Sequence, residues 1–148
     1  MTSRTDTSVA AVPATGQTHR FRGLVGTGLA ATLAATAATT LAAAVAGAAG
    51  VDFEIPDGGE TIPLPGFAVV TAFFSVVGIV IAVALLRWSA RPAGRFLWTT
   101  VVLTAVSFIP SVLSGGSPAT VLTLVALHVV AAAVMIPALT RGLRACTS

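Results

Sequence analysis

One ionisable side chain lies within the long apolar segments of this 148-residue chain, the imidazole of His128. At 1.5 Å per helical residue, His128 is roughly 13.5 Å from the start of its segment at Ala119. The same depth, counted from the corresponding ends of the other three segments, reaches Ser75, Thr104 and Thr40. An imidazole and three hydroxyls at one depth predict a buried polar layer, in which His128 donates one hydrogen bond and accepts another.

Two interpretations of this layer stay open. Polar side chains hydrogen-bond between membrane helices for about 0.6 kcal/mol on average, so the layer can be structural. Ionisable groups at membrane depth also mark proton relays and ligand contacts, which makes His128 a candidate functional residue. Proton and ion pathways usually include a carboxylate, however, and none of the four segments contains one. The pattern therefore favours a structural layer over a functional one.

The other reactive residue types are too scattered to form a metal, haem or catalytic site. His19 and Cys146 lie outside the apolar segments, so His128 lacks a second metal or haem ligand at its depth. No Asp or Glu is placed to orient His128 as a general base. The acidic residues between positions 51 and 65 do not have the spacing of a calcium-binding loop. We therefore expect no catalytic residue, no cofactor and no metal, and we interpret the acidic segment as a solvated loop.

Four long apolar segments must position these residues. The chain is 55% hydrophobic and 9% charged, whereas an ordinary soluble domain is about 25% charged, so a water-soluble globular protein is excluded. Uncharged runs cover residues 24–49, 66–86, 96–113 and 119–139, and each is near the length of about 20 residues that crosses a bilayer as a helix. Short connections join them, including one in which Ser117 is placed to cap the last helix. The predicted fold is an all-α membrane protein, an antiparallel up-down bundle of four transmembrane helices.

Charge is divided between the two sides of the predicted bundle. All eight basic residues are Arg, and they precede the first segment, separate the second from the third and follow the fourth. The other side carries Asp52, Glu54, Asp57 and Glu60 and no basic residue. The positive-inside rule therefore predicts cytoplasmic termini (N-in/C-in) and an extracytoplasmic acidic loop over residues 50–65. Lys, Asn and Tyr, whose codons are AT-rich, are absent. Their absence indicates a high-GC bacterial genome, so we expect the protein in a bacterial plasma membrane.

The chain divides into a tail and a membrane domain. Residues 1–19 are rich in Thr, Ser and Ala without apolar periodicity, which predicts a disordered cytoplasmic tail before a transmembrane domain over residues 20–144. One alternative is signal-peptidase cleavage near Ala46 or Ala48, which would leave three spans. A signal segment has about 7–15 apolar residues, and this run has 26. The net charge of +3 is spread over several loops, which argues against a nucleic-acid partner.

Several motifs of the chain resemble those of an uncharacterised family. They are Val51-Asp-Phe-Glu-Ile-Pro56, Leu86-Arg-Trp88, Arg91-Pro92 and the segment from Ala126 to Ala138. The family comprises small four-helix integral membrane proteins, mostly actinobacterial, and is filed as a domain of unknown function; the likeness covers residues 23–144. Some members are labelled cell envelope biogenesis protein OmpA, although this sequence predicts neither an eight-strand barrel nor a peptidoglycan-binding domain. The resemblance implies the four-helix topology and no catalytic or binding residue.

These patterns predict an integral membrane protein that is not an enzyme and serves as an accessory or structural membrane component. Its expected partners are the lipid bilayer and either a membrane protein or a second copy of the chain. The alternative is a small transporter or a carrier of a lipophilic ligand, which would use the polar layer around His128.

Overall fold

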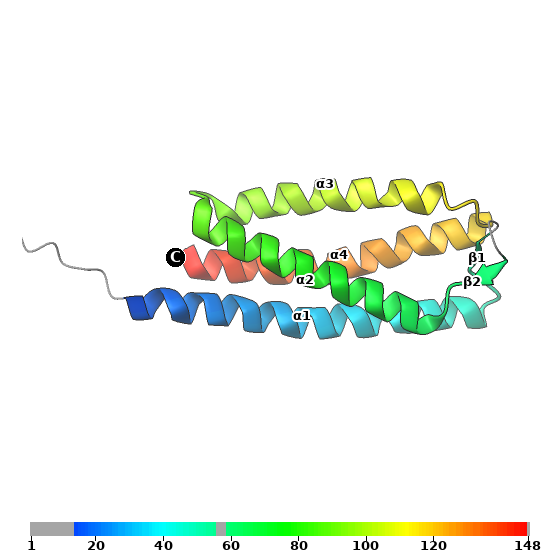
Figure 1. Cartoon of the computed structure of the whole chain (residues 1–148), viewed down its shortest axis with the longest axis horizontal. Helices are drawn as coiled ribbons and strands as arrows, with labels where there is room; N and C mark the ends of the chain where they lie inside the picture. The colour runs from blue at the N-terminus through cyan, green and yellow to red at the C-terminus, as the bar shows by residue number, and fades with distance from the viewer. Residues whose placement is uncertain (1–13, 56–58, 148) are drawn as a thin grey trace, which may run out of the picture.

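The computed structural model describes residues 14–55 and 59–147, within which four helices form an antiparallel bundle (Figure 1). The two short strands, β1 and β2, pair antiparallel in the loop between α1 and α2. Each of the four helices is long and apolar enough to cross a membrane, which confirms the predicted fold class. The elements are α1 (Ala14–Ala48), β1 (Glu54–Ile55), β2 (Glu60–Thr61), α2 (Leu64–Trp88), α3 (Pro92–Val112) and α4 (Pro118–Thr147).

The helices extend beyond the uncharged runs from which they were predicted. α1 begins at Ala14, so residues 14–19 are helical and not part of a disordered tail, while residues 1–13 lie outside the described part of the chain. α4 continues past Leu139 to Thr147. A helix can continue past the apolar layer because its backbone stays hydrogen-bonded and its Arg side chains reach water. α1 and α4, with 35 and 30 residues, are about 52 and 45 Å long and exceed the ~30 Å hydrocarbon core.

The two ends of the bundle differ in charge. α1 begins and α4 ends at the same end of the bundle (Figure 1), and this end, which we call the arginine end, carries Arg20, Arg22, Arg87, Arg91, Arg95, Arg141 and Arg144. The opposite, acidic end carries Asp52, Glu54 and Glu60 in the α1–α2 loop. The predicted acidic residue Asp57 lies outside the described residues. α1 packs most extensively against α2 and α4, and α3 packs mainly against α4.

Local sequence explains where the helices start and stop. The Ser117 hydroxyl oxygen accepts a hydrogen bond of 3.2 Å from the backbone N–H of Thr120, which confirms the expected cap of α4. α1 ends in a Schellman motif, because Gly50 has a φ of +98° and its N–H bonds to the carbonyl of Gly47, while the N–H of Val51 bonds to the carbonyl of Ala46. The chain therefore turns sharply at Gly50 and enters the acidic loop.

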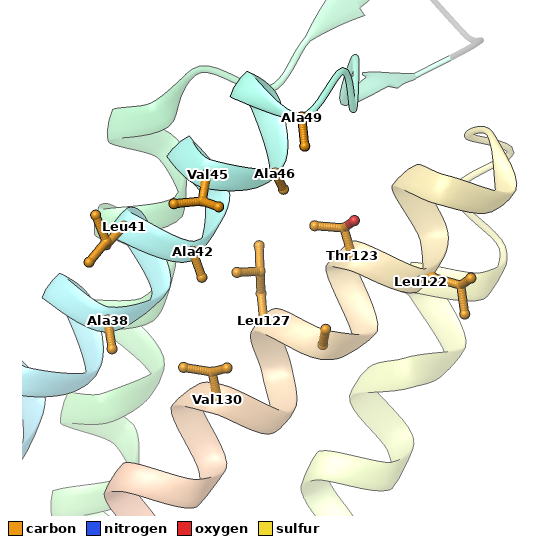
Figure 2. A pocket seen from close by; sticks show the side chains of 11 residues that line it. Ala38, Leu41, Ala42, Val45, Ala46, Ala49, Leu122, Thr123, Leu127 and Val130 are labelled. Carbon is orange, nitrogen blue, oxygen red and sulfur yellow. The ribbon is translucent and has the colours of Figure 1, made fainter.

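In the half of the bundle next to the acidic end, an open groove of about 710 Å³ lies between α1 and α4 (Figure 2). Beside it, Ala43 of α1, Phe53 of the loop and Leu127 of α4 form a small buried cluster. The groove is lined by Ala38, Leu41, Ala42, Val45, Ala46 and Ala49 from α1, and by Leu122, Thr123, Ala126, Leu127 and Val130 from α4. Small side chains on α1 leave the space between the two helices unfilled.

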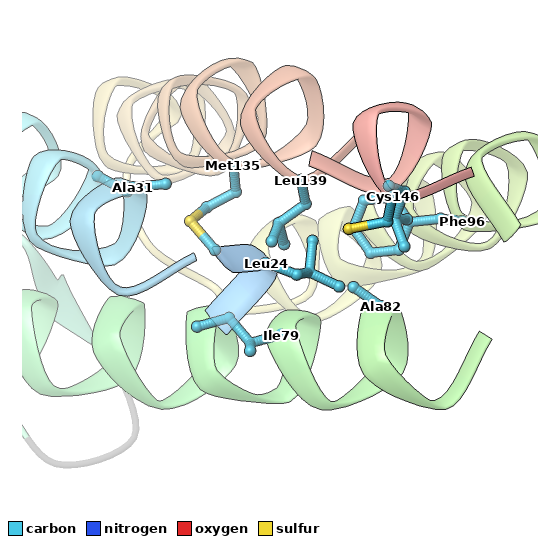
Figure 3. Close-up of a cluster of buried hydrophobic side chains, with 10 residues drawn as sticks. Leu24, Ala31, Ile79, Ala82, Phe96, Met135, Leu139 and Cys146 are labelled. Atoms are coloured by element: carbon cyan, nitrogen blue, oxygen red, sulfur yellow. The ribbon is translucent and has the colours of Figure 1, made fainter. Parts of the chain in front are cut away.

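The half next to the arginine end holds the main core, to which all four helices contribute (Figure 3). A Cβ atom added at Gly28 would lie 3.2 Å from Cδ2 of Leu139, and one at Gly142 would lie 2.9 Å from Cδ1 of Leu24. These two glycines allow α1 and α4 to pack closely here. The buried members of this core are Leu24, Ala31, Ala35, Ile79, Ala82, Phe96, Met135, Leu139, Leu143 and Cys146.

Candidate functional site

The candidate residue His128 lies half-buried on α4, facing α3. Its Nδ1 is 2.7 Å from the carbonyl oxygen of Leu124, one turn earlier in the same helix. A carbonyl oxygen only accepts, so Nδ1 donates this bond, and in the tautomer with a single proton on Nδ1 the Nε2 atom is an acceptor. The ring of Phe108 on α3 meets the imidazole in an edge-on arrangement with a centroid distance of 6.2 Å. His128 therefore bonds to its own helix and packs against its neighbour.

The other three members of the predicted layer lie on the other three helices. Ser75 on α2 is buried and Thr104 on α3 is half-buried. The Oγ1 atom of Thr40 on α1 is buried without a hydrogen-bond partner. Among the described residues, no hydrogen bond joins two of these four side chains. The structure thus holds four separate polar groups, and the expected bonds between His128 and neighbouring hydroxyls are replaced by its bond to Leu124.

A different pair of hydroxyls joins two helices. The side-chain oxygens of Thr39 on α1 and Thr71 on α2 are 3.1 Å apart. Thr39 also donates to the carbonyl of Ala35 at 2.9 Å, and a hydroxyl has one proton, so Thr71 is the donor in the pair. Counting depth from the helix end selected Thr40 and missed Thr39. The missed signal was the helix face, because Thr39 is one turn from the buried Ala35 and Ala43.

The acidic loop is bound to the bundle at its acidic end. Thr120 Oγ1 donates a hydrogen bond of 2.9 Å to Oδ1 of Asp52, and Thr120 itself is only 1% exposed. Phe53 is also buried, and its ring meets that of Phe67 on α2 with a centroid distance of 5.0 Å. Phe53 has a φ of +52°, which is uncommon for a bulky residue and marks local strain. The expectation of a solvated loop therefore holds for the exposed Glu54, but it is wrong for the Phe53 side chain.

The remaining candidate ligands are dispersed. Within the described part of the chain, no group of three His, Cys, Asp or Glu side chains is placed to hold a metal ion. Cys146 is buried near the arginine end, and its Sγ is 3.5 Å from the carbonyl oxygen of Arg20. This contact ties the end of α4 to the start of α1.

The outward face of α1 carries small side chains at a regular spacing. The exposed positions Gly23, Thr27, Ala30, Ala34 and Ala37 follow one another at alternating steps of four and three residues. A Cβ atom added at Gly23 would meet no atom within 4 Å. We call these five residues the α1 seam. Larger side chains are exposed outside this stripe: on α1 at Leu29 and Leu33, and on α2 and α3 at positions that include Val69, Phe73, Phe74, Val80, Leu97, Val102, Leu103 and Ile109.

A family model described as a family of unknown function, DUF6069, matches residues 19–145, which include nearly all of the bundle. The chain belongs to the DUF6069 family. No curated protein and no solved structure matches it. The matched range of DUF6069 nearly coincides with residues 23–144, so the resemblance of the sequence to an uncharacterised family is confirmed. The match to DUF6069 identifies no catalytic or ligand-binding residue in this chain, so the proposed function rests on the geometry of the bundle.

Proposed function

We propose that this DUF6069 protein is a non-catalytic accessory subunit of a larger membrane protein, and that it binds a transmembrane helix of that protein through the α1 seam. The spacing and the small size of the seam residues support this proposal. Alternating steps of four and three residues give the 3.5-residue repeat of left-handed helix pairs. In lipid, small residues favour helix association because they let two backbones approach closely. The larger side chains on α2 and α3 are suited to contact with lipid tails.

The partner proposal is tested by purification from native membranes in a mild detergent. We expect one membrane protein to co-elute stoichiometrically with the wild-type chain and to be lost when Ala34→Leu adds bulk to the seam. Ala105→Leu, the same change at an exposed position of α3, is the matched control and should keep the partner. Retention of the partner by Ala34→Leu would contradict the proposal. Crosslinking of two copies through the seam would make a second copy the partner.

We also propose that the arginine end faces the cytoplasm of a bacterial cell, which places both termini inside. The separation of seven arginines from the acidic loop supports this orientation. In a Cys146→Ser background, a membrane-impermeant maleimide added to intact cells should label Thr61→Cys at the acidic end. Gly94→Cys at the arginine end should react only after the cells are lysed. The opposite labelling pattern would reverse the orientation.

A second candidate function is a small transporter or a carrier of a lipophilic ligand that uses His128. One observation favours it: among the described residues no hydrogen bond engages Nε2 of this half-buried imidazole. An acceptor nitrogen at membrane depth can receive a proton or a hydroxyl of a ligand. Proton flux measured on His128 variants in liposomes separates this candidate from the accessory role.

A further inference from the structure

We infer that the groove between α1 and α4 binds one hydrocarbon chain of a membrane lipid whose headgroup is neutral overall and carries an amine. The groove lies in the half of the bundle next to the acidic end (Figure 2). The groove lining shares no residue with the α1 seam, although Ala37 of the seam is next to Ala38 of the groove, so the two proposals are tested with separate variants.

The lining of the groove selects for hydrocarbon. Every lining side chain except Thr123 is aliphatic. The hydroxyl of Thr123 donates to the carbonyl oxygen of Ala119 at 2.8 Å, so its proton is already used within α4. A polar ligand would lose its own hydrogen bonds in this groove without gaining new ones. An alkyl chain loses none and fills space that the alanines of α1 leave open.

The length of the groove matches one leaflet of a bilayer. Its α1 side runs from Ala38 to Ala49, which is about 16 Å at a rise of 1.5 Å per residue, close to the ~15 Å of hydrocarbon in one leaflet. A helix lying in the groove itself would have to continue between α1 and α4 toward the arginine end to cross the second leaflet. Closer to the arginine end, that space is closed, because Gly28 and Gly142 bring α1 and α4 into contact. The groove therefore fits a lipid chain of one leaflet better than it fits a helix.

Charge at the mouth of the groove selects the headgroup. Ala49 lines the groove three residues before the exposed Asp52, and the exposed carboxylates Glu54 and Glu60 follow in the same loop. The sequence contains no Arg or Lys between Arg22 and Arg87 or between Arg95 and Arg141. An anionic headgroup would meet carboxylates without a compensating cation, whereas the ammonium of a phosphatidylethanolamine headgroup has acceptors there.

Photocrosslinking in vesicles tests this inference. The full-length protein is reconstituted with a phosphatidylethanolamine that carries a diazirine in its acyl chain, and the labelled peptides are identified by mass spectrometry. We expect labelling to concentrate in residues 38–49 and 122–130. The same diazirine chain on phosphatidylglycerol should label these peptides less, because of its anionic headgroup.

Two leucine substitutions on α4 give a matched comparison. Ala126 lines the groove and is exposed at its edge, whereas Ala133, also exposed, lies one heptad further along α4 outside the groove. Ala126→Leu should reduce the labelling of both groove peptides to the level of the other exposed helix faces, and Ala133→Leu should leave it unchanged. A circular dichroism melt checks that both variants fold, and Ala38→Leu fills the groove from α1 as an independent variant.

Three results would overturn the inference. The first is uniform labelling of all exposed helix faces by the phosphatidylethanolamine probe. The second is unchanged labelling of the groove peptides in folded Ala126→Leu and Ala38→Leu. The third is equal labelling of these peptides by the phosphatidylglycerol probe, which would contradict the assigned headgroup.

Discussion

Thr120, in the first turn of α4, donates a hydrogen bond of 2.9 Å to Asp52 in the loop that follows α1. The bond joins two segments that are 68 residues apart in the sequence. The backbone N–H of Thr120 also donates a hydrogen bond to the hydroxyl oxygen of Ser117, which caps α4. Thr120 therefore takes part both in the N-terminal cap of α4 and in the contact between α4 and the α1–α2 loop at the acidic end of the bundle. Phe53, the next residue after Asp52, is buried beside Phe67.

Replacing Thr120 by Val should lower the free energy of unfolding by about 1–2 kcal/mol, because the Thr120 hydroxyl loses its hydrogen bond to the Asp52 carboxylate and its contact with the Ser117 hydroxyl, while the exposed Asp52 can still be hydrated. Unfolding in mixed micelles with increasing SDS measures this change. Thr123→Val is the matched control, since the Thr123 hydroxyl bonds only to Ala119 in its own helix, and its effect should be close to zero. Equal effects of the two substitutions would mean that the contact with Asp52 contributes nothing.

Two hydroxyls lead to opposite predictions: that of Thr71 on α2, which is bonded to Thr39 of α1, and that of Thr40 on α1, which has no partner. Thr71→Val removes the donor to Thr39 and should cost about 0.6 kcal/mol, the average for polar contacts between membrane helices. Thr40→Val removes a buried hydroxyl that has no partner, so the stability should stay the same or rise. A double-mutant cycle of Thr39→Val with Thr71→Val measures the pair directly. A coupling energy of zero would show that the bond does not stabilise the bundle.

The fold was more predictable from the sequence than the contacts between side chains. Uncharged runs predict the number of helices and their antiparallel order, because only a helix satisfies the backbone of a single segment in lipid. The run that starts at Leu24 did not predict that α1 begins at Ala14, since a helix continues beyond the apolar layer. Depth along the axis selected Thr40 over Thr39, although adjacent residues point about 100° apart around a helix. The bond between Asp52 and Thr120 lies in a loop where Phe53 has a positive φ, and no local pattern predicts either feature.

Close packing of α1 in the main core predicts that Gly28 tolerates no side chain. A Cβ atom there would lie 2.7 Å from Cγ1 of Ile79, so Gly28→Ala should destabilise the bundle by about 1–3 kcal/mol through overpacking. Gly23→Ala, also on α1, meets no atom within 4 Å and should be neutral or stabilising because alanine favours the helix. Thermal unfolding in detergent compares the two variants. If Gly28→Ala melts at the same temperature as Gly23→Ala, α1 is not held as closely as the structure shows.

Substitutions of His128 distinguish the accessory role from the transporter role. For a structural residue, His128→Ala should lower the free energy of unfolding by about 1–2 kcal/mol, because it removes the bond to Leu124 and the contact with Phe108. His128→Gln should recover part of this loss, since a glutamine amide can also donate to the carbonyl of Leu124. Under the accessory role, liposomes containing the wild type and either variant should show the same proton flux with a pH-sensitive dye inside. A flux that is specific to the wild type and lost in folded His128→Gln would instead make the imidazole a functional group of a transporter, since glutamine can keep the hydrogen bond but cannot carry the proton.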